Sequence, residues 1–326
     1  MKHSTLQTTI KSIILGISIA GTAQAGSLAS AVVTIDNFTI SRNGTAVDYN
    51  QFSSLNFTSS SDVSATLDGV NSNNSASSSN GGLIDLYASQ GTPGPANNSF
   101  PELTAGSGVP GPIGSNYAVA DTYEFGSPIS GLPSGTPLFT DDTGAQATFL
   151  GVASYVSLTG TGDGSAQSNN SLQALFSFSL NEGGALDFTF DVNPFVETYL
   201  ETGGNGSADA SFSVVFSLLD LAGNSLLDAS SAPFFINPIT GEFVFGSTRS
   251  SGAPGTGISN QFGAGGPITL SFSTLNLTAG TQYQLSARMN ATADAVFIPE
   301  PETLALLGIG LLGIAFNIRK KAPIAA

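Results

Sequence analysis

Carboxylates are the only side chains of this sequence that could carry acid–base chemistry. The chain has no Cys, and its one His is His3, so a thiol nucleophile, an internal His base and the usual zinc ligands are missing. Its densest acidic cluster is Asp187, Asp191, Glu197 and Glu201. On one strand, Asp187 and Asp191 would lie about 13 Å apart, whereas the carboxyl pairs of glycosidases lie ~5–9.5 Å apart. We therefore predict no catalytic residues and no enzyme.

Acidic residues in Gly-containing loops offer a second chemistry, the binding of calcium. Asp141, Asp142, Asp163 and Asp220, the last followed by Asn224, would supply the oxygen ligands that a hard cation prefers. Their spacing matches neither an EF-hand nor a nonapeptide repeat. The sequence thus predicts no cofactor and no assigned metal site, and it leaves Ca²⁺ as the one alternative.

Aromatic residues could bind a glycan, because a flat ring packs against a pyranose. The sequence has no Trp, its seven Tyr are scattered, and most of its 22 Phe alternate with polar residues, as is typical of a core. The most distinctive polar-aromatic segment is 116–125. Its Tyr123 and Glu124 could meet a ligand, although the end of a strand is the simpler interpretation.

Alternation of apolar and polar residues predicts that strands position all of these groups. In residues 283–295 every second side chain is apolar, which is typical of a long strand with one buried and one solvent-exposed face. Shorter runs of the same kind cover 174–180, 186–192 and 210–218, and further strand-like segments lie at 31–40 and 116–125. Turn residues at 181–184, 222–224, 238–241 and 279–280 predict hairpins between strands.

This pattern predicts an all-β fold, an antiparallel β-sandwich of jelly-roll or immunoglobulin-like type. A solenoid is the alternative, although the sequence shows no fixed repeat. The Ser/Asn/Gly-rich stretch 71–82 and the Pro/Gly-rich stretch 91–114 are expected to be loops. Strand-like segments on both sides of them favour one domain over residues 26–298, rather than a split near 159–170.

The charge of this central part excludes one class of partner. Residues 26–298 contain 21 acidic side chains and only three basic ones, Arg42, Arg249 and Arg288, which gives a net charge of −18. Affinity for a polyphosphate comes from Lys and Arg that displace counterions. We therefore expect no binding of nucleic acid.

The N-terminus has the three parts of a secretory signal peptide, residues 1–25. Lys2 and Lys11 are basic, residues 13–20 are apolar, and Ala23 and Ala25 form an A-x-A cleavage site. The apolar run is too short to span a bilayer as a helix. These features predict export through the Sec machinery and removal of the segment by signal peptidase.

The C-terminus has a three-part pattern of its own, followed by a tail at 322–326. The residues outside its helix are Pro299, Glu300, Pro301, Arg319, Lys320 and Lys321. Between them, the apolar segment 304–318 would form a transmembrane helix of roughly 22 Å at ~1.5 Å per residue. The basic cluster should remain cytoplasmic, which leaves residues 26–298 outside the cytoplasm.

These residues resemble the PEP-CTERM sorting signal of exopolysaccharide-producing Gram-negative bacteria. The resemblance is confined to the C-terminal ~30 residues, with the signal itself at 299–321, and implies cleavage near the Pro-Glu-Pro by an exosortase-type enzyme. It also implies a precursor anchored in the inner membrane and later delivered to the cell surface or the extracellular matrix.

Together these patterns favour a structural or adhesive protein of an exopolysaccharide matrix or biofilm. A glycan-binding module for a matrix polysaccharide, with or without Ca²⁺, is the first alternative. A carboxylate-dependent enzyme that acts on polysaccharide is the second.

Overall fold

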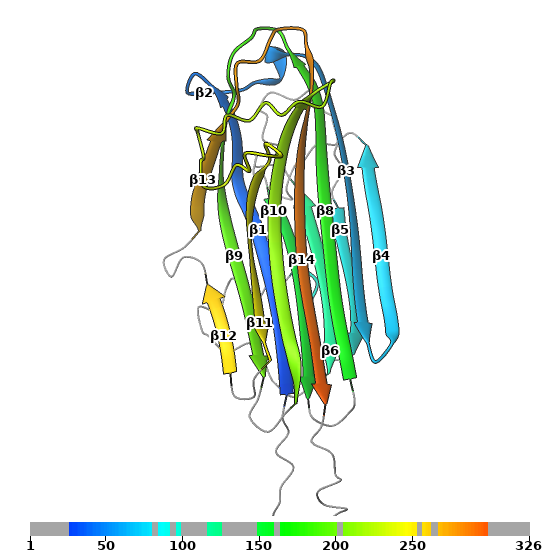
Figure 1. Cartoon of the computed structure of the whole chain (residues 1–326). Coiled ribbons are helices and arrows are strands. Elements are labelled where there is room, and N and C mark those ends of the chain that lie inside the picture. Colours follow the sequence, from blue (N-terminus) through cyan, green and yellow to red (C-terminus); the bar gives the residue numbers. More distant parts are fainter. Residues whose placement is uncertain are drawn as a thin grey trace, which may run out of the picture.

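The computed structural model describes residues 26–79, 84–91, 96–98, 116–125, 149–159, 164–200, 205–252, 256–261 and 267–298. In these ranges the chain forms two antiparallel sheets that pack face to face (Figure 1). Both sheets contribute side chains to one core. The predicted all-β architecture of antiparallel sheets is therefore confirmed. The predicted transmembrane helix at 304–318 lies outside the described residues.

The eight-stranded sheet has the order β12-β9-β1-β7-β6-β5, with β13 also beside β9 and β2 beside β1. Its strands are β1 (Gly26–Arg42), β2 (Thr45–Ala46), β5 (Ile84–Gly91), β6 (Tyr117–Phe125), β7 (Phe149–Thr159), β9 (Asp187–Leu200), β12 (Thr256–Gln261) and β13 (Ile268–Ser273).

The six-stranded sheet has the order β11-β10-β14-β8-β3-β4. Its strands are β3 (Phe52–Leu67), β4 (Val70–Ser79), β8 (Gly164–Leu180), β10 (Asn205–Asp220), β11 (Phe243–Ser251) and β14 (Gln282–Ile298). One 3-10 turn, η1 (Tyr49–Gln51), precedes β3, and its N-cap Asp48 accepts a hydrogen bond from the Asn50 backbone N–H at 2.9 Å. In the described part of the chain, no helix has the length and apolar character needed to cross a membrane.

The long alternating segment forms the strand that its pattern predicts. On β14 every second residue from Tyr283 to Phe297 is buried, whereas the residues between them are mostly exposed or half-buried. β14 pairs with β10 on one side and with β8 on the other along almost its whole length. The last described segment of the chain is thus an inner strand of its sheet.

Two of the predicted hairpins are wrong. Residues 181–184 connect β8 to β9, and residues 279–280 lie between β13 and β14, but in both cases the two strands belong to different sheets. The two connections meet each other, since the Gly184 N–H donates to the Leu277 carbonyl at 2.9 Å. A Gly-containing turn reverses the chain whether or not the next strand stays in the same sheet. Turn residues alone therefore could not distinguish the two outcomes.

The prediction of a loop at 71–82 is also wrong for most of its length, because residues 70–79 form β4. Asp68 and Gly69 have φ angles of 51° and 78°, the positive values that a tight primed hairpin turn requires. This turn holds β4 against β3 in an unbroken register from Leu67↔Val70 to Thr58↔Ser79. Backbone pairing forms the strand here although its side chains are small and polar.

The core has two unlike ends. At one end six phenylalanines pack with ring centroids 4.9–6.2 Å apart. They are Phe38, Phe188, Phe190, Phe216, Phe243 and Phe272. At the other end, where β1 begins and β14 ends, alanines are the commonest side chains of the interior, together with a few larger ones such as Val156, Leu158 and Phe297. The alanines include Ala29, Ala31, Ala65, Ala118, Ala120, Ala208, Ala210, Ala291, Ala293 and Ala295.

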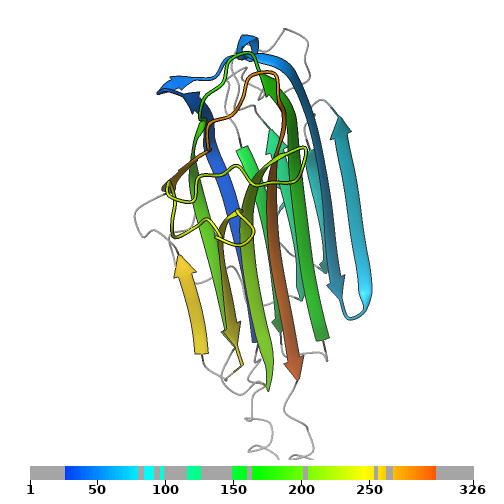
Figure 2. The same ribbon diagram turned by 45° about the horizontal axis from the view of Figure 1, so that its top comes forward.

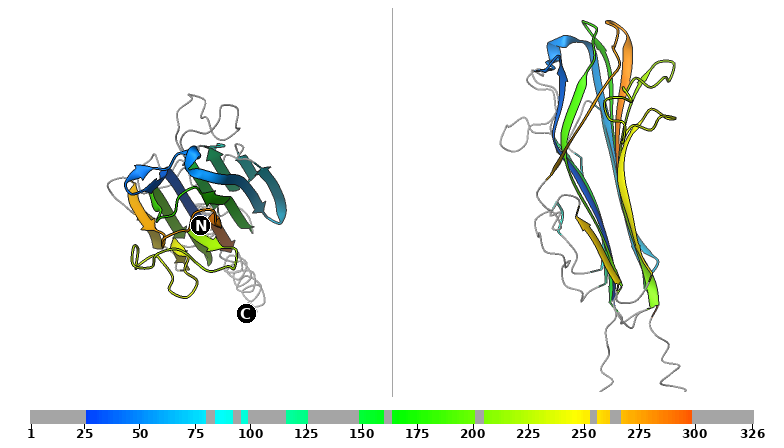
Figure 3. Two further views of the ribbon diagram at one scale, coloured as in Figure 1. Left: turned by 90° about the horizontal axis from the view of Figure 1, so that it is seen from above. Right: turned by 60° about the vertical axis from the view of Figure 1, so that its left-hand side comes forward.

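The two sheets come together at the alanine end. Figure 3 shows the layers converging toward the end where β14 terminates. The Ser154 hydroxyl of β7 donates to the Ala291 carbonyl of β14 at 2.9 Å, so a short side chain of one sheet reaches the backbone of the other. Stacked sheets are normally ~10 Å apart, a distance that larger side chains fill. Small side chains permit this closer approach.

Candidate functional site

Most of the residues that the sequence singled out lie outside the described part of the chain. They are Ala23, Ala25, Asp141, Asp142, Asp163, Glu201, Pro299, Glu300, Pro301, Arg319, Lys320 and Lys321. Among the residues that are described, no three acidic or His side chains come close enough to hold a metal ion.

Asp220 stabilises a turn. Its Oδ1 accepts hydrogen bonds from the backbone N–H groups of Ala222 and Asn224 at 2.9 Å, and its Oδ2 accepts from the Asn224 side chain at 2.8 Å. The Asn224 bonds are the main reason why the pKa of the Asp220 carboxyl is lowered. The Asp220 carboxylate therefore stabilises the turn that follows β10.

Asp187 and Asp191 likewise link strands. Both lie on the outer face of β9, where the Asp187 carboxylate accepts from the Ser273 hydroxyl at 2.6 Å. Asp191 accepts from the Thr269 hydroxyl at 2.6 Å and from the Asn37 side chain at 2.9 Å, and these two bonds lower its pKa. The two carboxylates thus connect β9 to β13 and to the irregular turn of β1.

The outer face of the eight-stranded sheet gathers most of the tyrosines. We call this surface the tyrosine face. Five of the seven tyrosines lie on it: Tyr87, Tyr117, Tyr123, Tyr155 and Tyr199. Tyr155 pairs with Ser30 on one side and Val119 on the other, and Ser30 in turn pairs with Glu197. Residues that are scattered along the chain therefore become neighbours across β9, β1, β7 and β6.

Acidic side chains lie among these tyrosines. Asp121 and Glu197 are only 1% and 7% exposed, and burial raises the pKa of each to about 7. The Asn98 backbone N–H donates to Asp121 at 2.7 Å, and the side chains of Asn97 and Asn98 donate to exposed Asp85 at 3.0 and 3.1 Å. The two aspartates thus hold the 97–98 turn against β5 and β6.

The spacing of these carboxyls does not match that of a glycosidase. Asp121 lies on β6 and Glu197 on β9, three strands apart, which corresponds to about 14 Å at ~4.8 Å per strand. A retaining or inverting pair requires ~5–9.5 Å. Raised pKa values are frequent at functional sites, but here burial accounts for them.

Tyr123 and Glu124 lie on opposite faces of β6. Tyr123 is half-buried on the tyrosine face, 6.0 Å from the Phe149 ring, whereas Glu124 points into the core beside Ser59 of β3. Burial raises the pKa of Glu124 to about 7. The two side chains cannot meet one ligand on one face, and β6 ends at the next residue, Phe125.

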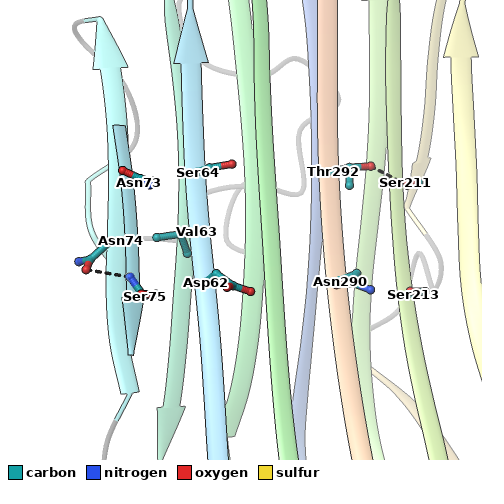
Figure 4. Close-up of a pocket in the computed structure, with 10 residues that line it drawn as sticks. All are labelled: Asp62, Val63, Ser64, Asn73, Asn74, Ser75, Ser211, Ser213, Asn290 and Thr292. Atoms are coloured by element: carbon teal, nitrogen blue, oxygen red, sulfur yellow. Dashed lines mark hydrogen bonds between the residues drawn. The ribbon is translucent and has the colours of Figure 1, made fainter. Parts of the chain in front are cut away.

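The outer face of the six-stranded sheet has a different character. We call it the hydroxyl-amide face, because Ser, Thr, Asn and Gln dominate its rows. A groove of about 860 Å³ runs over it, lined by Asp62, Val63, Ser64, Asn73, Asn74, Ser75, Ser211, Ser213, Asn290 and Thr292 (Figure 4). Between the lining residues, hydrogen bonds join only Asn74 to Ser75 and Thr292 to Ser211. Apart from Val63, every lining residue carries a hydroxyl, amide or carboxylate group that could bind a ligand or water.

The sequence alone did not predict that the tyrosine face or the hydroxyl-amide face would form a continuous surface. Strand parity alone places Tyr117, Asp121 and Tyr123 on one side of β6, and this signal was available. Tyr155 and Tyr199 belong to the same face only because β7 and β9 lie in the same sheet as β6. No local pattern contains that information.

Comparison with known proteins extends these observations to the C-terminus. No curated protein and no solved structure matches the chain. A family model described as the PEP-CTERM protein-sorting motif matches residues 297–321, beginning at the last two residues of β14. The chain therefore carries a PEP-CTERM protein-sorting motif at its C-terminus, as the Pro-Glu-Pro, apolar and basic segments predicted.

Proposed function

We propose that this protein is an exported substrate of an exosortase-type enzyme and serves as a structural or adhesive component of the cell surface or of an exopolysaccharide matrix. The observation that carries the proposal is the sorting motif, which begins where β14 ends. Export through Sec and cleavage by signal peptidase would precede this step. The proposed role is non-enzymatic.

The places where the first described strand begins and the last one ends support such a route. β1 begins and β14 ends at the same end of the sandwich (Figure 1). From Ile298 to residue 304, where the apolar segment begins, an extended chain spans at most about 20 Å. In the proposed precursor, the alanine end of the sandwich therefore stands next to the membrane.

The central position of β14 connects folding with export. β14 holds β10 on one side and β8 on the other, so without it the six-stranded sheet would fall into two parts. We infer that this sheet closes only after residue 298 has crossed the membrane. The sorting segment follows within a few residues.

Mass spectrometry of the cell-surface product tests the proposal. We expect a mature chain that lacks residues 1–25 and ends near Pro301. A Glu300→Ala variant should keep its C-terminal segment and remain in the membrane fraction, whereas the matched control Glu242→Ala should be processed normally. An intact chain in the cytosol, or equal processing of both variants, would refute the proposal.

Glycan binding is the second candidate, and the groove on the hydroxyl-amide face favours it. Asp62 is the one charged side chain in that lining, so the groove suits a neutral, hydroxyl-rich chain better than a polyanion. Pull-down with the matrix polysaccharide, with and without EGTA, tests this role. A Ser64→Lys variant should reduce the bound fraction, and the control Ser250→Lys on β11 should not. Unchanged binding by Ser64→Lys would exclude the groove.

A further inference from the structure

In the part of the chain that the structure describes, one edge of the six-stranded sheet is open. β4 is its last strand, and it pairs with β3 through one side only. In the described part of the chain no backbone hydrogen bond reaches its other side. Figure 2 shows β4 at the outer margin of the sheet, beyond β3. Every second residue of this ten-residue strand thus turns its backbone N–H and C=O groups outward, away from β3.

The other described edges carry devices that discourage pairing. Residues 235–236 pair with the start of β11, where the Val244 N–H donates to the Phe235 carbonyl at 2.7 Å, and Arg249 adds a charge. β12 and β13 are only six residues long. β5 carries Asp85, to which the 97–98 turn is bonded. Short strands, charges and covering loops are the usual protection of sheet edges.

Among the described residues, none gives β4 this protection. Its residues include no charge and no proline, and its pairing with β3 contains no bulge. β3 shifts register against β8, and β1 shifts against β9, so irregular pairing does occur elsewhere in this fold. A regular, uncharged edge is the kind that accepts another strand.

Charge identifies the partner that fits this edge. Two copies of a body with net charge −18 repel each other over most of their surface, and β4 is a long strand without a carboxylate. Two identical antiparallel edges are also self-complementary about a two-fold axis, so their pairing closes as a dimer. A second copy of this chain therefore meets little electrostatic opposition from the side chains of β4 itself.

We propose that β4 of one copy pairs antiparallel with β4 of a second copy. The two six-stranded sheets then join into one continuous sheet, and the two hydroxyl-amide faces become a single surface. Side chains add little apolar burial, so the backbone hydrogen bonds carry the association. The dimer is consequently favoured where export concentrates the protein, as at a cell surface. The pairing does not depend on glycan binding or on the exosortase.

A cysteine scan tests the pairing directly, because the natural chain contains no Cys. The full-length chain is produced with one substitution at a time, Ser72→Cys, Asn73→Cys, Asn74→Cys, Ser75→Cys or Ala76→Cys, and treated with an added oxidant. Directly opposed residues of antiparallel strands have Cα atoms ~4.5–5.5 Å apart, within the range that a disulfide bridges. We expect one position to give a species of twice the chain mass, with yields that fall on either side of it.

Two control experiments show whether the cross-link is specific to pairing through β4. Ser250→Cys, exposed on the edge strand β11, should not cross-link. Adding Asn71→Lys and Ser77→Lys, which flank the scanned positions on β4, to the best single-Cys variant should reduce the dimer about tenfold, since like charges then oppose each other across the axis. Thermal unfolding verifies that each variant is folded.

Three outcomes overturn the proposal. One is the absence of any cross-linked dimer in the β4 scan. Another is equal cross-linking through Ser250→Cys. The third is a cross-linked band that contains a different protein instead of a second copy of the chain.

Discussion

The phenylalanine end and the alanine end of the core show how side-chain size sets the distance between two sheets. At the first end, Phe216 lies with its ring centroid 5.0–6.0 Å from those of Phe38, Phe190, Phe243 and Phe272. At the second end, Ser154 reaches the Ala291 carbonyl of the opposite sheet. Rings therefore hold the sheets apart, and methyl groups allow them to meet. The thin end is the end nearest the sorting motif.

Phe216→Ala should have the largest effect on stability. Its ring is fully buried between four other rings, so truncation leaves a large cavity. We expect the free energy of unfolding to fall by about 3–5 kcal/mol, measured by urea denaturation. The control Phe234→Ala, at a residue 94% exposed, should change it by less than about 0.5 kcal/mol. Equal losses in the two variants would mean that the phenylalanine cluster does not stabilise the core.

The second prediction concerns pH and the buried carboxyl between the two ends. Glu124 has an ordinary pKa of 4.5 that burial raises to about 7, so the folded state holds its proton more tightly than the unfolded state does. The contribution of Glu124 to the free energy of unfolding is therefore highest below about pH 4.5 and falls as the pH rises toward 7. The shift corresponds to about 3 kcal/mol for complete ionisation.

Glu124→Gln isolates this contribution. Relative to the natural chain, the variant should gain stability between pH 5 and pH 8, as thermal or urea unfolding at each pH would show. Asp121 and Glu197, whose pKa values are also raised to about 7, give residual slopes of the same sign. If the free energy of unfolding depends on pH in the same way for the natural chain and for Glu124→Gln, then Glu124 is not a buried group with a raised pKa.

Ala293→Leu tests the thin end. Ala293 is fully buried near the end of β14, at the alanine end, so three extra carbons must push the sheets apart. We expect a loss of about 1–3 kcal/mol in the free energy of unfolding. Ala229→Leu, at an exposed turn position, is the matched control. If Ala293→Leu proves neutral, the alanine end has spare room and the contrast between the two ends disappears.

Ser154→Ala should have the smallest effect. It removes the hydroxyl bond between the sheets but keeps the small volume that the close approach requires. We expect a loss of about 0.5–1.5 kcal/mol, measured by thermal unfolding. Ser250→Ala, on an exposed face, provides the baseline. A loss comparable to that of Phe216→Ala would show that the hydroxyl bond, and not alanine packing, holds this end together.

Alternation in the sequence was a reliable guide to strands with one buried face. β14, β10 and the first part of β9 were predictable because their apolar residues repeat every two positions. β4 was not predictable in this way, since its side chains are polar on both faces and only the pairing with β3 makes it a strand. The connection at 181–184 was misassigned for a related reason, because a turn does not specify the sheet of the next strand.

The sequence by itself determined the sorting motif and the all-β character of the body. Both depend on short-range patterns: a contiguous Pro-Glu-Pro, apolar and basic series, and a period of two. Only the tertiary structure decided which strands are neighbours, and therefore that five tyrosines share one face and that β4 is an open edge. The physical reason is that sheet neighbours are chosen by packing between segments far apart in the chain, which no local period encodes.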